Sequence, residues 1–116
     1  MFRPMGLPNL TILTKRADFL RAASARRVST PGFTLQYVRN DVEEIRVGFT
    51  CSKKVGNAVA RNRAKRRLRE IARLVLPTHG QAGFDYVLIG RRDVTATRDF
   101  KDMQSDLERA LAKAHA

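Results

Sequence analysis

The sequence KKVGNAVARNRAKRRLREIAR, residues Lys53 to Arg73, combines the strongest helical pattern of the chain with its highest density of positive charge. On a helix of 3.6 residues per turn, four of its apolar side chains and one just beyond it share a stripe, the spacing of a face that packs on a core. Asn57 is the expected N-cap, and Pro77 is expected to end the helix after Leu76. The stripe that the other elements must cover contains Ala64, Leu68, Ile71, Ala72 and Val75.

The same stretch carries most of the positive charge of the chain. It holds nine Lys or Arg residues against one acid, Glu70, and so contributes +8 of the net charge of +12. Like charges at every fourth position weaken an isolated helix by a few tenths of a kcal/mol per pair, and a polyanion would turn that repulsion into attraction. The pattern therefore favours a nucleic-acid-binding helix over a face that is merely solvated. The fourfold repeat contains Arg61, Lys65, Arg69 and Arg73.

Length and composition place the chain among small basic proteins. Its 116 residues are expected to form one domain, residues 1–116, large enough to bury a core without disulfides or metal. A pI near 11.2 indicates a nucleic acid or an anionic membrane as the partner. No run approaches the ~18 apolar residues typical of a spanning helix, and the basic helix lacks an apolar insertion face. We therefore expect no membrane association and a cytoplasmic location.

Residue types that carry catalysis or bind metal are not gathered into a recognisable pattern. The single cysteine, Cys51, cannot form an internal disulfide and is interpreted as a small packed hydrophobe. His79 and His115 have no partner at triad or ligand spacing. The sequence therefore predicts no catalytic residue, metal site or cofactor on the protein itself. The acids near the C-terminus are interpreted as a solvated surface: Asp99, Asp102, Asp106 and Glu108.

The N-terminal part predicts a short helix. Residues 1–13 contain two prolines and are expected to form an irregular lead-in. Thr14 can then cap a helix over Lys15 to Ala25. Its one aromatic, Phe19, is either a core anchor or part of a binding surface.

Two stretches alternate between apolar and polar residues, as strands do. They are residues 33–38 and 45–52, and we expect them to pair as a hairpin with one apolar face. The other face carries small polar side chains and leads directly into Lys53 and Lys54. That face is either solvated or able to hold an extended single strand.

The C-terminal part completes an α/β arrangement. The apolar run FDYVLI, residues 84–89, predicts a strand covered on both faces, so that strand, basic helix and strand form a crossover that would ordinarily be right-handed. A last amphipathic helix is expected to begin at Thr97 or Asp99. The predicted order is α-β-β-α-β-α on a small mixed sheet.

The run KKVGNAVARNRAKRRLRE resembles the signature of the bacterial ribonuclease P protein subunit. Its core is the Arg61-Asn62-Arg63 triplet, followed by Lys65-Arg66 and then Arg69. The resemblance extends to RVGFTCS at residues 46–52, to the Asp18-Phe19 pair and to the strand and helix that close the chain. It covers nearly the whole sequence.

The resemblance implies a protein that binds a catalytic RNA, one copy of each, and promotes endonucleolytic removal of the 5′ leader from precursor tRNA. The complex is a hydrolase, and its chemistry belongs to the RNA subunit with Mg²⁺. The implied fold is a two-layer α/β (α+β) sandwich with a left-handed β-α-β crossover, an exception to the usual hand. No obligate protein partner is implied.

Two surfaces follow from the resemblance. The helix that faces the RNA subunit would use Lys53, Lys54, Arg61, Asn62, Arg63, Lys65, Arg66, Arg69 and Arg73. A cleft between the sheet and the first helix would hold the single-stranded leader with Phe19, Gln36, Thr50 and Ser52.

The chain departs from the family pattern at two cleft positions. Ala23 stands where a second aromatic is frequent in the first helix, and Gln36 stands at an aromatic strand position. Tyr37 is adjacent, and a register slip of one residue would restore the aromatic. We therefore expect weaker stacking on the leader.

Two other functions share some of these features. A ribosomal or assembly protein that binds structured RNA would have the same charge and a similar small fold, without needing the full signature. A self-sufficient nuclease would need a carboxylate cluster or a His pair.

Overall fold

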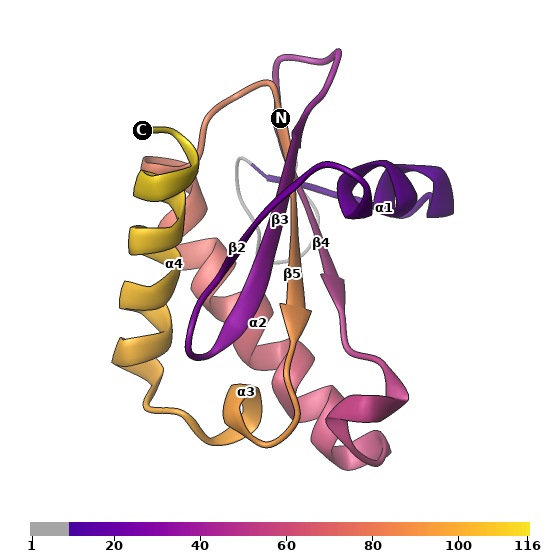
Figure 1. The fold of residues 1–116 in the computed structure, drawn as a ribbon, viewed down its shortest axis with the longest axis vertical. Helices are drawn as coiled ribbons and strands as arrows, with labels where there is room; N and C mark the ends of the chain where they lie inside the picture. Colours follow the sequence, from indigo (N-terminus) through magenta and orange to yellow (C-terminus); the bar gives the residue numbers. More distant parts are fainter. Residues whose placement is uncertain (1–9) are drawn as a thin grey trace, which may run out of the picture.

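The chain forms a five-stranded sheet with helices packed on both faces (Figure 1). The computed structural model describes residues 10–116. The strands are β1 (Thr11–Ile12), β2 (Arg26–Ser29), β3 (Phe33–Arg39), β4 (Ile45–Thr50) and β5 (Phe84–Gly90). The helices are α1 (Arg16–Ala23), α2 (Ala58–His79), α3 (Val94–Thr97) and α4 (Phe100–Ala114), with a 3-10 turn η1 (Lys53–Val55) before α2. None of these helices is long and apolar enough to cross a membrane.

Strand β5 occupies the centre of the sheet, whose order is β1-β4-β5-β3-β2. It runs parallel to β4 and antiparallel to β3, so the predicted hairpin is wrong: β3 and β4 lie on either side of β5. The reason is burial, because the run from Asp85 to Leu88 is buried and a strand covered on both faces belongs in the middle of a sheet. The crossover through α2 therefore joins parallel neighbours. Its left hand stays a prediction.

The main core lies between the sheet and a layer formed by α2 and α4 (Figure 1). The apolar stripe predicted on the basic helix is confirmed, because all five of its side chains are buried. The apolar face predicted for the two alternating strands is also confirmed, and it faces this stripe. The stripe packs with Phe33, Leu35 and Val47 of the sheet and with Met103, Leu107 and Leu111 of α4.

The two ends of α2 are set by different residues. Asn57 is the N-cap as predicted, and its Oδ1 accepts a hydrogen bond of 2.9 Å from the amide of Ala60. Pro77 does not end the helix, which continues to His79. A proline in the last turn costs only one intrahelical bond, and the Gly80 amide still donates to the carbonyl of Leu76 at 2.8 Å. The predicted end was therefore one turn too early.

The N-terminal part contains two short edge strands that local patterns did not predict. Within the predicted lead-in, Leu10 and Leu13 are buried and the intervening β1 pairs in parallel with β4. The rest of that lead-in, residues 1–9, lies outside the described residues. Helix α1 ends at Ala23, and its N-cap is Lys15 in place of Thr14. The chain then forms β2, whose sequence RRVS lacks an alternating pattern and gains its strand conformation by pairing with β3.

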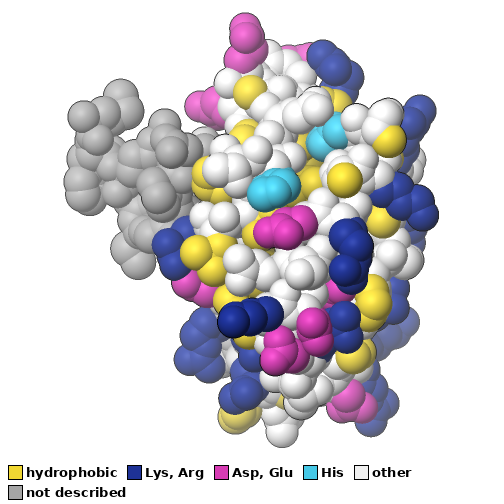
Figure 2. Space-filling view, turned by 90° about the vertical axis from the view of Figure 1, so that its left-hand side faces the viewer, with side chains coloured by type: hydrophobic (Ala, Val, Ile, Leu, Met, Phe, Trp, Pro, Cys, Tyr) yellow, Lys and Arg dark blue, Asp and Glu magenta, His cyan; other side chains and the backbone are white. Residues whose placement is uncertain are grey.

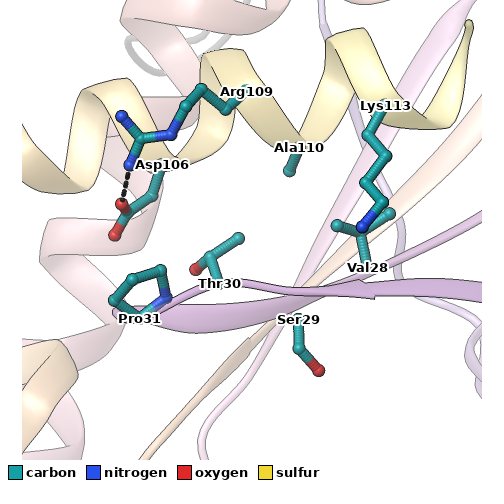
Figure 3. A pocket seen from close by; sticks show the side chains of 8 residues that line it. All are labelled: Val28, Ser29, Thr30, Pro31, Asp106, Arg109, Ala110 and Lys113. Carbon is teal, nitrogen blue, oxygen red and sulfur yellow. Dashed lines mark hydrogen bonds and ion pairs between the residues drawn. The ribbon is translucent and has the colours of Figure 1, made fainter.

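Helix α4 is capped as predicted but carries one buried acid. The Asp99 side chain accepts hydrogen bonds from the amides of Lys101 and Asp102. Asp106, expected on a solvated surface, is buried and accepts from Arg98 Nε at 2.8 Å and from Arg109 Nη2 at 3.0 Å. Asp106 and Arg109 line a pocket of about 120 Å³ between β2 and α4 (Figure 3). Asp106 therefore holds α4 in place and is no part of a solvated face.

Candidate nucleic-acid interface

The sheet face under α1 carries two rows of side chains, with apolar residues on β5 and polar residues or glycine on β3 and β4. The register places Gln36, Val87 and Gly48 side by side across β3, β5 and β4. One step along the strands, Thr34, Ile89 and Thr50 form the next row, and all three are half-buried. The first row is buried under α1, whereas the second row is partly exposed, so an extended ligand can reach this face along the second row.

Phe19 lies on this face and is half-buried. Its ring packs against a small cluster made by Leu13, Ala22 and Val87. It also lies directly over Gly48, where an added Cβ would be 2.6 Å from two ring carbons. Phe19 thus anchors α1 to the sheet and still presents part of its ring to solvent.

The structure brings three of the four predicted cleft residues onto this face. Phe19 lies above the row that contains Gln36, which is buried and only 5% exposed, and Thr50 belongs to the next row, which is half-buried. Ser52 follows the end of β4 and is exposed, but its hydroxyl already accepts the amide of Lys54 at 3.3 Å. Tyr37 packs against the main core on the opposite face, so the register slip that would place it in the cleft does not occur.

Arg91 is a cleft residue that sequence reasoning did not assign. Its Nη2 donates to Thr34 Oγ1 at 3.2 Å, so a guanidinium lies beside the second row at β3. The signal was the alternation of β5, because the face that carries Val87 and Ile89 continues at the next odd position, which is Arg91.

The predicted RNA-binding residues extend from the end of β4 along α2. Lys53 and Lys54 are exposed in η1, immediately after Ser52. On α2, one flank faces β4: the Arg69 guanidinium lies 5.8 Å from the centroid of the Phe49 ring. Arg61 and Arg73 are half-buried, and the other predicted residues of α2 are exposed: Asn62, Arg63, Lys65, Arg66 and Arg69.

Cys51 lies beside this flank and packs against the main core, as its interpretation as a small hydrophobe requires. Burial raises the pKa of its thiol, and the positive charge of Lys65 opposes that shift. A raised pKa disfavours the reactive thiolate. Cys51 is therefore a packing residue next to the basic surface.

The other flank of α2 is tied to the segment around α3. Arg63 Nε donates to the carbonyl of Ala96, and Arg67 Nε donates to that of Thr95, both at 2.9 Å. Arg67 also donates to the carbonyl of Arg98. Desolvation, together with the charge of Arg63, lowers the pKa of Arg67. Arg67 is thus a structural cation, and Arg63 has a partner within the protein although its side chain stays exposed.

Arg73 also has a partner within the protein. Its guanidinium pairs with Glu70 one turn earlier, and this hydrogen bond raises the pKa of Arg73 and lowers that of Glu70. Ion pairs within residues 10–116 use Arg73 but none of the other predicted RNA-binding side chains. The cations best placed for phosphates are therefore those from Lys53 to Arg69 that face β4 or solvent.

The face formed by α4 differs in character. Figure 2 shows it with Lys and Arg side chains interspersed among Asp, Glu and His. His115 lies here against Phe84, and its Nε2 is 2.6 Å from the hydroxyl of Tyr86. Burial lowers the pKa of His115 and raises that of Tyr86 to about 12. Within residues 10–116, no group of three or more His, Cys, Asp or Glu residues is placed to hold a metal ion.

Comparison with known proteins gives one consistent answer. Residues 7–115 match the family model described as Ribonuclease P. The chain is 61% identical over 110 residues to the ribonuclease P protein component of Ruegeria pomeroyi, a match covering 92% of this chain and 88% of the relative. Among solved structures, it resembles the RNase P protein of Staphylococcus aureus, with a TM-score of 0.73, 31% identity and coverage of 89% and 94% of the two chains. The Thermotoga maritima RNase P protein gives a TM-score of 0.75 at 28% identity, covering 87% of this chain and 94% of that one.

Proposed function

The chain belongs to the ribonuclease P protein family, and on that premise we propose that its two polar surfaces bind two different RNAs. As a ribonuclease P protein component, it is a subunit of a tRNA-processing endoribonuclease that works with an RNA subunit. The flank of α2 binds the RNA subunit, one protein to one RNA. The sheet face under α1 binds the single-stranded 5′ leader of precursor tRNA. The assembled enzyme acts in the cytoplasm.

One observation carries this division of labour: the two surfaces are continuous along the chain. Strand β4 ends at Thr50 in the cleft, and the chain continues through Ser52 into Lys53 and Lys54 at the start of the basic surface. A leader that crosses the second row therefore meets cations at both ends, Arg91 on one side and η1 on the other. Guanidinium and ammonium groups bind phosphates without regard to sequence, which suits leaders of varied sequence.

The basic surface has the strength that RNA binding requires. If about six phosphates are neutralised, the logarithm of the binding constant falls with the logarithm of salt concentration at a slope of about −4 to −5. Residues 10–116 supply no cluster of three or more acidic, His or Cys side chains placed to hold a metal ion, and we assign the hydrolytic chemistry to the RNA subunit with Mg²⁺. The side chains described here position RNA, and none acts as acid, base or nucleophile.

Site-specific crosslinking in the reconstituted holoenzyme tests the proposal. Single cysteines are introduced by Thr50→Cys, Arg66→Cys and Lys113→Cys in a Cys51→Ala background, and each is modified with a short photoreactive group. Thr50→Cys should crosslink to the leader and Arg66→Cys to the RNA subunit. Lys113→Cys, on the mixed-charge face of α4, should crosslink to neither. Equal leader crosslinking from Thr50→Cys and Lys113→Cys would contradict the assignment of the cleft.

A further inference from the structure

The end of the sheet face next to the cleft is closed by a buried cluster of charges. At its centre is Asp85 of β5, whose side chain is fully buried. Arg46 of β4 binds it with two parallel hydrogen bonds, from Nε at 2.7 Å and from Nη2 at 2.8 Å. Asn40 donates a third at 2.9 Å. These contacts lie within the sheet and its loops, and they already neutralise the carboxylate.

Helix α1 adds its own pair of charges to this cluster. Arg21 Nη2 donates to Asp85 Oδ2 at 2.8 Å, and Asp18 lies 3.8 Å from Arg46 and 3.6 Å from Arg21. The Arg21 side chain is 40% exposed, whereas that of Asp85 is inaccessible. Arg21 is thus a link from the helix to a carboxylate that the sheet has already paired.

The position of this link decides how α1 is oriented. The helix has eight residues and a single fully buried side chain, Ala22, so its apolar contact with the sheet is small. At 100° per residue, Asp18 and Ala22 face the sheet, while Arg21 and Phe19 lie on the two borders of that face. A helix that contacts the sheet only along this narrow stripe can rotate about its own axis. The hydrogen bond from Arg21 to Asp85, on one side of the stripe, opposes the rotation that would lift Phe19, on the other side, away from Gly48.

We propose that Arg21 is a positioning residue for the leader, which by binding Asp85 holds the ring of Phe19 at a fixed height over the cleft. This inference rests on the proposed leader-binding function of the cleft. Arg21 acts through Phe19 and does not touch the leader. Because Arg46 and Asn40 keep Asp85 paired, removing the Arg21 guanidinium changes the seating of α1 more than it changes the fold.

The experiment is a double-mutant cycle in the reconstituted holoenzyme, with Phe19→Ala, Arg21→Met and both together. Dissociation constants are measured for precursor tRNA and for mature tRNA, which lacks the leader. Phe19→Ala should weaken precursor binding by roughly 5- to 10-fold, the low end of base stacking on an aromatic, and Arg21→Met by roughly 3-fold. The double variant should be no weaker than Phe19→Ala alone, because one residue acts through the other. Mature tRNA should be unaffected throughout.

A matched control is Arg16→Met, which removes the same charge from an exposed position of the same helix. It should leave precursor binding unchanged, and an equal loss from Arg16→Met and Arg21→Met would overturn the proposal. The proposal would also be overturned if the losses of precursor affinity multiplied in the double variant and Arg21→Met flattened the salt dependence by about one unit. That result would mean that Arg21 contacts a phosphate directly. If Phe19→Ala separates the two RNAs and Arg21→Met does not, only the positioning role fails. If Phe19→Ala affects both RNAs alike, the cleft assignment fails and the inference with it.

Discussion

The ring of Phe19 lies on the bare backbone of Gly48, so close that a Cβ at Gly48 would be 2.6 Å from both Cε1 and Cζ of the ring. No real Cβ contact is that short, so either the ring or the helix that carries it would have to move. The absence of a side chain at Gly48 is therefore what allows an aromatic ring to contact the sheet at this point. The Phe19–Gly48 contact, the basic flank of α2, the buried Asp106 and the half-buried His115 each give a testable prediction.

Gly48→Ala should displace Phe19 and weaken precursor tRNA binding. The added methyl group overpacks the contact, with an expected loss of about 1 to 3 kcal/mol in the free energy of unfolding. Leader-dependent affinity should fall with it, while mature tRNA binding stays unchanged. Gly83→Ala is the control: its φ of 91° makes any side chain costly, yet nothing lies within 4 Å of the added Cβ. If both variants lose stability but neither loses leader affinity, Phe19 has no contact with the leader.

The double variant Arg61→Ala/Lys65→Ala should weaken binding to the RNA subunit and flatten the salt slope by about one unit per lost contact. Folding should survive, because neither side chain forms an ion pair within the described part of the chain. Titrations at several salt concentrations measure the slope. Arg67→Met is the informative comparison: it breaks hydrogen bonds to α3 and should lower the melting temperature while keeping the slope. An unchanged slope in the double variant would show that this flank is only solvated.

Asp106→Asn should reduce the stability of the protein and leave the rate of cleavage by the holoenzyme unchanged. The carboxylate is buried and paired with Arg98 and Arg109, and since Arg109 is well exposed we expect a loss of about 2 kcal/mol, below the range for a fully buried pair. Thermal unfolding measures the loss. Single-turnover cleavage by the holoenzyme at saturating protein and substrate should keep its rate. A folded Asp106→Asn protein whose complex no longer cleaves would mean that the protein contributes a catalytic carboxylate.

His115 should make the free protein less stable at acidic pH. Burial lowers its pKa in the folded state below the ordinary value of 6.5, so the unfolded chain binds the proton more readily. The stability that neutral His115 contributes is present above pH 6.5 and is lost as the pH falls through the folded-state pKa. His115→Gln should therefore show a smaller difference in melting temperature between pH 8 and pH 5 than the parent protein. The same difference in both proteins would assign the pH dependence to other groups.

Local patterns in the sequence were enough to predict the parts of the fold that depend on neighbouring residues. The stripe on α2, the Asn57 and Asp99 caps and the alternation of β3 and β4 are all properties of short windows, and the structure confirms each one. The position of β5 between β3 and β4 is different, because it depends on contacts far apart in the sequence. A run that is apolar on both faces indicates a central strand, but it does not say which strands flank it.

The candidate site shows the same division. The sequence shows directly which residues are basic and how they are spaced. It does not show which of these cations already have a partner within the protein. Arg63 and Arg67 bind carbonyls around α3, more than 25 residues further along the chain, and residue type alone does not distinguish them from the free cations of α2. Asp85 was likewise expected to be simply part of an apolar strand. Its burial is compensated by Arg46 and Asn40 from other parts of the chain, and Arg21 of α1 adds a further hydrogen bond.

The central place of β5 also has a consequence for how the protein is made. β5 is the last strand to leave the ribosome, yet it supplies the inner hydrogen-bonding partner of both β3 and β4. Neither strand can complete its hydrogen bonding until residues 84–90 are available, so β3 and β4 can join one sheet only late and through distant contacts. Before that step the basic segment is already outside the ribosome, with its like charges unpaired and free to attract RNA. Folding of the nascent chain and its capture by RNA therefore compete for the same interval, and low salt favours capture.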